Sequence, residues 1–227
     1  MTTTAQSVIH RVVTTLQDAS AVRWATNELV RYLNDGQRDI INVRPDATAT
    51  TVTITCVAGA RQTLPSTASK LLDIVRNVAT TSNKQVVRKI NRQMLDTVNP
   101  TWHVATSSVD ISNYMYDPLD PRVFYVYPPA TTLAQLSTVV SAYPTDVTEP
   151  ADNVVYTSVT GNISVADIFA NPLRDYILFR AFSKDAESAA NATRAQAHYA
   201  LYTNALNLEL KGTIDIAPST SGAPNHG

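Results

Sequence analysis

Apolar and polar residues follow a helical period in the first part of the chain. Over 4–17 the apolar positions recur at steps of one, three and four residues, which places them on one helix face. A second stripe predicts a helix over 26–43, with Thr26 as its N-cap. Pro45 closes it, because the residue before a proline disfavours the helical conformation. Two helices are therefore expected before the pattern changes.

The same period returns in the middle and in the last third of the chain. A stripe of apolar positions predicts a helix over 85–97. Pro172 lies in the first turn of the next expected helix, over 171–185, and an alanine-rich helix over 189–210 follows it. Because the link between the last two is short, we expect them to form an antiparallel hairpin.

Between these helices the pattern is that of β-strands. Residues 51–57 alternate Thr with apolar residues, and a turn leads to a returning strand over 61–64. We assign 71–80 to a strand because of its β-branched residues, which makes 51–80 a β-rich stretch. From 101 to 163, aromatic and β-branched residues predict a sheet whose last strand covers 153–164.

Together these elements predict an α+β protein. Its N-terminal, middle and C-terminal helices would form one helical bundle, with a small antiparallel β-sheet layer beside it. Residues 1–211 would make a single domain. The remaining residues, 212–227, are rich in Gly, Pro and Ser and are predicted to form a flexible, extended C-terminal arm.

The composition is that of a globular protein, with 44% apolar and 16% charged residues among 227. Lys and Arg number 18 against 19 Asp and Glu, and this balance argues against a dedicated nucleic-acid-binding protein. The single cysteine, Cys56, excludes an internal disulfide and fits a reducing compartment. No secretion signal is expected, since the first residues lack a basic region followed by an apolar one. No membrane span is expected either, since the uncharged stretch 123–145 contains three prolines.

The sequence indicates no catalytic, metal or cofactor site. The six glycines are too scattered for a phosphate-binding loop, and no two of the four histidines have the i, i+4 spacing of a helical zinc site. No serine lies in a G-x-S-x-G turn, so a hydrolase is supported only by the number of Ser, Asp and His residues. We therefore expect that the protein is not an enzyme and carries no cofactor.

Three separated stretches of the chain resemble a known family, in the right order. They are WATNELVRYLNDGQRDIINVRPDA (24–47), DPLDPRVFYVYPP (117–129), and NPLRDYILFRAFSKDAES (171–188) followed by ATRAQAHYALYTNAL (192–206). These stretches are similar to the head-to-tail adaptor proteins of tailed bacteriophages, which are connector proteins akin to the tail tubular protein A group of podophages. The sheet region at 101–163 departs from that pattern.

This resemblance implies a ring, dodecameric in such adaptors, that is fixed beneath the portal at one vertex of the capsid. The implied partners are the portal protein, a tail or nozzle protein and further copies of the chain. The genome would pass through the ring with only transient, non-specific contact, which suits a wall of near-neutral charge. The implied location is the capsid–tail junction of the virion, after synthesis in the host cytoplasm.

Two sets of residues are candidate contact sites. In such adaptors a C-terminal extension often reaches the portal, and here TIDIA alternates as an added β-strand would. The residues assigned to portal binding are Gly212, Thr213, Ile214, Asp215, Ile216, Ala217 and Pro218. Arg88, Lys89 and Arg92 lie opposite the apolar side of the helix expected over 85–97, and they either form a solvated face or line the DNA channel.

A β-rich tail or baseplate component that binds a receptor or a carbohydrate is the alternative function. Such a protein shares the Thr-, Tyr- and Val-rich strands of this chain. It does not need so much helix at both ends, which is why the adaptor is preferred.

Overall fold

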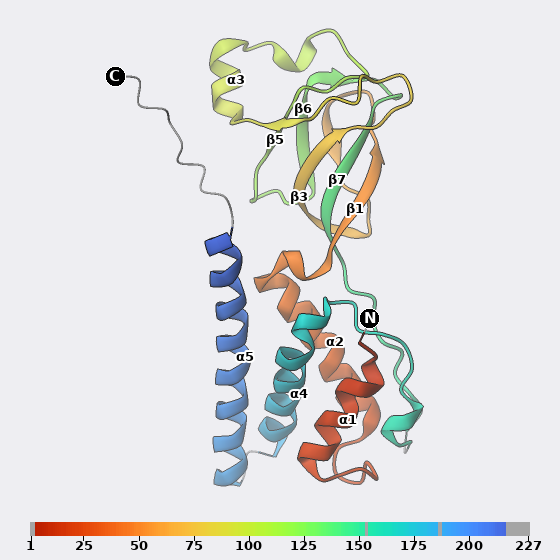
Figure 1. Cartoon of the computed structure of the whole chain (residues 1–227), viewed down its shortest axis with the longest axis vertical. Helices are drawn as coiled ribbons and strands as arrows, with labels where there is room; N and C mark the ends of the chain where they lie inside the picture. Colours follow the sequence, from red (N-terminus) through yellow and green to blue (C-terminus); the bar gives the residue numbers. More distant parts are fainter. Residues whose placement is uncertain (1–2, 153, 186–187, 217–227) are drawn as a thin grey trace, which may run out of the picture. The chain divides into compact units, whose positions relative to one another are not determined.

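The computed structural model describes residues 3–152, 154–185 and 188–216, with side chains described as far as Leu208. The chain divides into two compact units, shown in Figure 1. Residues 1–44 and 145–227 form what we call the helical unit, and residues 45–144 form the β unit. The stretch 1–211, expected to be a single domain, is thus shared between two units, one of which is inserted into the other.

In the described part of the chain, four α-helices build the helical unit. They are α1 (Ala5–Leu16), α2 (Thr26–Val43), α4 (Ala170–Lys184) and α5 (Ala189–Ile216), and two short 3-10 helices, η3 (Tyr156–Ser158) and η4 (Asp167–Phe169), precede α4. The helices expected over 4–17, 26–43 and 171–185 are present with each end within one residue. Among these described helices, none has the length and apolar character that a membrane crossing requires.

Capping and tertiary contacts explain where the first two helices begin. The hydroxyl of Thr4 accepts a hydrogen bond from the Ser7 N–H (3.1 Å), which starts α1. Helix α2 begins at Thr26 itself and has no side-chain cap. The Thr26 hydroxyl instead donates to the carbonyl of Val154 (2.7 Å), so the N-cap role predicted for Thr26 is wrong.

Two buried amides on α2 hold the chain that returns from the β unit. Asn34 donates through Nδ2 to the Val147 carbonyl (2.9 Å) and accepts through Oδ1 from the Val147 N–H (2.9 Å). Gln37 accepts through Oε1 from the Ser164 N–H (2.5 Å). These bonds fix the returning stretch to α2 at two points, and they leave neither buried amide unsatisfied.

Two sheets form the β unit. Their strands are β1 (Ala49–Thr55), β2 (Gly59–Thr63), β3 (Ala68–Asn77), β4 (Arg88–Lys89), β5 (Asn113–Tyr116), β6 (Val123–Ala130) and β7 (Gln135–Ala142). The strand orders are β1-β7-β3 and β2-β6-β5-β4, and only β4 with β5 is a parallel pair. Buried residues from both sheets, among them Ile74, Phe124 and Leu136, form one core. The returning strand expected over 61–64 therefore pairs with β6 and not with β1.

The predicted bundle of N-terminal, middle and C-terminal helices with a small sheet layer is wrong. The helix expected over 85–97 is split into β4 and a short helix, α3 (Arg92–Val98), and both belong to the β unit. The strand expected over 153–164 is replaced, in its described residues, by η3 and a single bridge between Thr4 and Asn162. The protein is α+β, with a larger share of sheet and a bundle made without the middle helix.

Candidate interaction sites

The three basic residues expected on one helix face lie on two different elements. Arg88 and Lys89 are exposed and form β4, and Arg92 is the first residue of α3. Consecutive residues of a strand point to opposite sides, so Arg88 and Lys89 do not share a face. Asn91 separates them from the helix, because its side chain accepts the Gln93 N–H (2.8 Å) and caps α3. The predicted basic helix face is therefore not formed.

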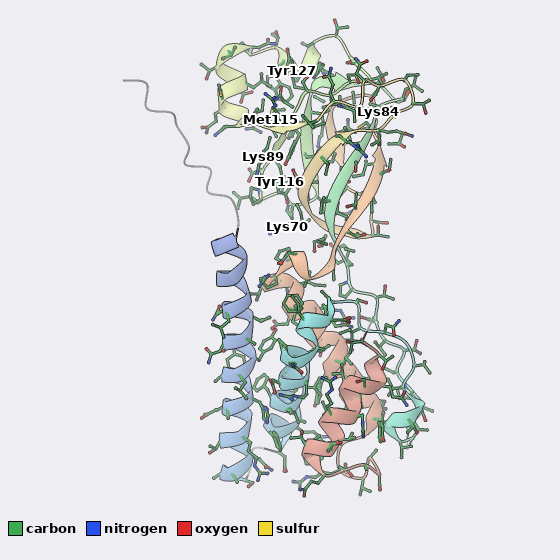
Figure 2. All side chains as sticks on the ribbon, in the orientation of Figure 1. Lys70, Lys84, Lys89, Met115, Tyr116 and Tyr127 are labelled. Atoms are coloured by element: carbon green, nitrogen blue, oxygen red, sulfur yellow. The ribbon has the colours of Figure 1, made fainter. Side chains whose placement is uncertain are left out.

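Lys89 lies beside a cavity of about 580 Å³ in the β unit. Its ammonium is 5.9 Å from the centre of the Tyr116 ring, and Figure 2 shows Lys89, Tyr116 and Met115 close together on one side of the β unit. The cavity is lined by Lys89, Ile90, Asn91, Arg92, Gln93, Met115, Tyr116, Asp117, Pro118 and Tyr125. Half of these residues are aromatic or apolar, and the other half are polar or charged, with Lys89 and Arg92 as cations and Asp117 as an anion.

Strand pairing and one tryptophan position the walls of this cavity. Met115 lies opposite Tyr125 in the β5–β6 pair, and Trp102 packs edge-on against Tyr125 with ring centres 6.1 Å apart. The indole N–H of Trp102 donates to the Asp96 carboxylate (2.7 Å), which holds α3 over the sheet. The same carboxylate is 3.6 Å from Arg92 Nε, so the charge of Arg92 is partly balanced within the β unit.

The lining of the cavity offers both charged and apolar contacts to a binding partner. Lys89 can attract an anionic group, while the apolar floor accepts an aliphatic or aromatic side chain. The β unit carries eight Lys and Arg against six Asp and Glu, a net charge of +2, whereas the helical unit carries ten against thirteen, a net charge of −3. The sequence pattern did not reveal this cavity, because Met115, Tyr116 and Tyr125 meet the residues at 89–93 only through tertiary pairing.

The described residues hold no reactive constellation that would add chemistry to these surfaces. No group of three or more His, Cys, Asp or Glu side chains within them could hold a metal ion. The thiol of Cys56 is buried, and its desolvation raises its pKa to about 11, so it stays protonated at neutral pH.

The C-terminal segment assigned to portal binding differs in conformation from the expected arm. Helix α5 continues through Ile216, so Gly212, Thr213, Ile214, Asp215 and Ile216 are helical and do not form an extended strand. Ala217 and Pro218 lie outside the described residues. The alternation of TIDIA favoured a strand, but the long helix that precedes it continues through the same residues.

The chain is a mixed helical and β protein with a cavity beside Lys89 in its β unit. In a comparison with known families, the matching family model is described as SU10 adaptor protein, and it covers residues 3–225. The chain belongs to the SU10 adaptor protein family, and its resemblance to phage head-to-tail adaptors is confirmed. It is a structural adaptor of the phage virion. No curated protein matches the chain.

Proposed function

We propose that the chain forms a closed ring of about twelve copies between the portal protein and the tail or nozzle protein, with the genome passing through its centre. The observation that carries this proposal is the family match across residues 3–225, since an adaptor joins other virion components. The ring, the portal contact and the passage of DNA go beyond the family match, so each needs an experiment of its own.

The length of α5 supports a contact through its C-terminal end. α5 has 28 residues and α4 has 15, so at 1.5 Å per residue α5 is about 42 Å long and α4 about 22 Å. The two helices are adjacent and joined by a short link, so the last turns of α5 have no neighbour in α4. We assign the portal contact to this end, from Gly212 to Pro218, of which Gly212 to Ile216 are helical.

A truncation experiment tests the portal contact. A chain that ends at Lys211 should lose only the helical signal of the removed residues and keep its melting temperature, but it should no longer associate with purified portal protein in negative-stain images and on gel filtration. Twelve weak contacts in one ring bind together, so their common loss should abolish the complex. The matched control ends at Ser221 and should still cap the portal with a ring. Retained capping by the chain that ends at Lys211 would contradict the assignment.

We assign transient DNA contact to Arg88, Lys89 and Arg92. A nearly neutral ring wall with a few cations allows DNA to slide, because each phosphate contact adds salt-dependent affinity. Lys89 makes no ion pair within the described residues, and Arg88 likewise makes none, so both charges are available. Charge reversal at the three positions should slow or stall genome ejection in particles that assemble normally. Ejection at the usual rate would show that these side chains are merely solvated.

A further inference from the structure

The outward side of α5 is an uncharged surface. From 195 to 208 the sequence contains no Asp, Glu, Lys or Arg, although 16% of the chain is charged. Tyr199, Leu201 and Leu208 are 49%, 53% and 68% exposed. Ala197, Leu201, Asn204 and Leu208 are all exposed and follow each other at steps of four, three and four, the spacing of a helix-packing seam. We call these four residues the α5 stripe.

The opposite side of α5 is fully used within the helical unit. Ala195, Tyr202 and Leu206 are buried. The Tyr202 ring is 5.3 Å from that of Tyr176 on α4, and its hydroxyl donates to Asp39 on α2 (2.5 Å). The α5 stripe therefore is not needed to pack α5 within one copy, and nothing in the described residues covers it.

A second uncharged surface lies on the stretch 154–166, which contains no Asp, Glu, Lys or Arg. Apart from Val155, which is 40% exposed, its exposed residues are small or polar and include Thr157, Ser158, Thr160 and Asn162. We call this stretch the 154–166 face. Side chains this short let a helix approach the backbone closely.

The 154–166 face is held firmly against α1. Gln6 Nε2 donates to the Thr157 carbonyl (3.1 Å), and the His10 and Tyr156 rings stack with centres 4.8 Å apart. Backbone bonds add to this, because the Ala5 N–H donates to the Gly161 carbonyl (3.0 Å). A surface fixed in this way loses little conformational entropy when it is covered.

The two uncharged surfaces lie at opposite edges of the helical unit. In Figure 1, α5 forms one edge, α4 follows, and α1 with η3 lies at the other edge. Several charges elsewhere in this unit form ion pairs within it, as in Arg31–Glu149 (2.7 Å) and Lys184–Glu28 (2.7 Å). Because both surfaces lack charged residues, packing one on the other would bury no unpaired charge.

We propose that the α5 stripe of one copy packs on the 154–166 face of the next copy around the ring. This inference rests on the proposed ring, because a closed ring needs two different patches on opposite sides of each protomer. The stretch 197–208 is about 18 Å of helix and about 12 Å wide, so it covers about 200 Å², the centre of an interface in which each partner buries roughly 800 Å². Both surfaces lack charged residues, which is typical of the core of a protein–protein interface.

A cysteine cross-linking experiment tests the pairing of these surfaces. Cys56 is the only native cysteine and its thiol is buried, so introduced cysteines supply the reactive thiols. Particles assembled with the double variant Leu201→Cys, Thr157→Cys are treated with a short bismaleimide. We expect a ladder of covalent dimers, trimers and larger species on a denaturing gel, and no ladder with either single variant. Val22→Cys with Thr157→Cys is the matched control, because Val22 is 86% exposed but lies outside the stripe.

A charge-swap experiment covers the case in which the cysteine variants fail to assemble. Leu201→Arg or Thr157→Arg alone should reduce ring formation on the portal at least about tenfold, because each would bury an unpaired charge. Leu201→Arg combined with Thr157→Glu should restore it, whereas Leu201→Arg with Thr157→Arg should not. Circular dichroism of each variant checks that the fold is unchanged.

The outcomes separate this interface from the ring itself. Rings that form without a ladder and tolerate both arginine substitutions would overturn the interface and leave the ring intact. Dimers from Leu201→Cys alone would show that α5 packs on α5, which also overturns it. Absence of any ring from wild-type particles and portal complexes would refute the proposed function as well.

Discussion

At the scale of single residues, Asp18 organises the turn between α1 and α2. Its carboxylate accepts the N–H groups of Val22 (3.0 Å), Arg23 (2.8 Å) and Trp24 (2.9 Å). The desolvation of Asp18 raises its pKa, but the three backbone donors and the charge of Arg23 outweigh this and hold the pKa below its ordinary value. A carboxylate in this position stabilises the folded state only while it is ionised.

We expect Asp18→Asn to lower the free energy of unfolding by about 1 kcal/mol at pH 7, since the amide lacks one of the two acceptor oxygens and the charge. Because the folded-state pKa is depressed, the contribution of Asp18 is present above the ordinary pKa and is lost as the pH falls through the folded-state value. The difference between wild type and variant should therefore shrink below about pH 4. Urea unfolding at pH 7 and pH 3 measures this.

Asp152→Asn is the control for the Asp18 experiment, because the exposed carboxylate of Asp152 accepts a single bond from Asn27 (2.6 Å). It should change the stability little at either pH. An equal loss of stability for Asp18→Asn at both pH values would contradict an electrostatic role for the carboxylate.

Residues such as Asn34 and Gln37 mark the limit of prediction from sequence at this scale. The sequence correctly predicts the buried apolar stripe of α2, but these two buried amides interrupt it. Their partners, Val147 and Ser164, are more than a hundred positions away in the chain. A pattern of neighbouring residues carries no signal of a hydrogen bond over that distance, so the amides could only be expected on the surface.

At the scale of elements, one glycine allows α2 to approach α4. A Cβ atom at Gly36 would lie 2.7 Å from Leu173 Cδ1 and 2.8 Å from Tyr176 Cδ1, both on buried side chains of α4. Contacts this short require those side chains to shift within a packed core. Glycine is used here for close helix packing, although it is a poor helix former.

We expect Gly36→Val to lower the stability of the protein by about 1–3 kcal/mol, as overpacking does in other cores. The gain in helix propensity over glycine is smaller than this loss. Ala190→Val adds a similar side chain at an exposed site on α5 and should have little effect. Thermal unfolding followed by circular dichroism gives both values. A Gly36→Val protein as stable as wild type would show that α4 can move away at little cost.

At the scale of elements, the stretch 85–97 shows why the spacing of apolar residues predicted a helix where the structure has a strand and a short helix. Val87 donates its N–H to the Val75 carbonyl (3.3 Å), and Arg88 donates to the Ser112 carbonyl (3.0 Å). This segment thus runs between β3 and β5, and its conformation is set by strands that precede and follow it. The apolar spacing of Val87 and Ile90 fits a helix equally well, so only the pairing decides.

At the scale of the whole molecule, the division into two units was not predicted. The β unit is one continuous stretch, 45–144, with its own core, while the helical unit is assembled from both ends of the chain. The resemblance to adaptor proteins came from residues of both units, and it was correct without this division. A core formed by residues of two sheets depends on contacts between distant positions, and neither the composition nor the spacing of apolar residues predicts such contacts.

We expect residues 45–144 to fold when they are expressed alone, because their core residues come from this stretch only. The isolated unit should unfold cooperatively in urea, followed by the fluorescence of Trp102, its only tryptophan. Phe124→Ala, which removes a fully buried ring, should lower its stability by about 3–5 kcal/mol. A gradual, non-cooperative loss of signal from the wild-type stretch would refute its independence.

The pairing of β1 with β7 has a consequence for how such proteins diversify. Ala49 lies opposite Ser141, so the points where the chain enters and leaves the β unit are neighbours, and Pro45 and Pro144 stand just outside them. A stretch whose two ends meet can be exchanged for another of any length without rerouting the framework that holds it. The β unit is therefore a self-contained insertion, open to replacement by evolution or by protein engineers who want to keep the helical unit and change what it carries.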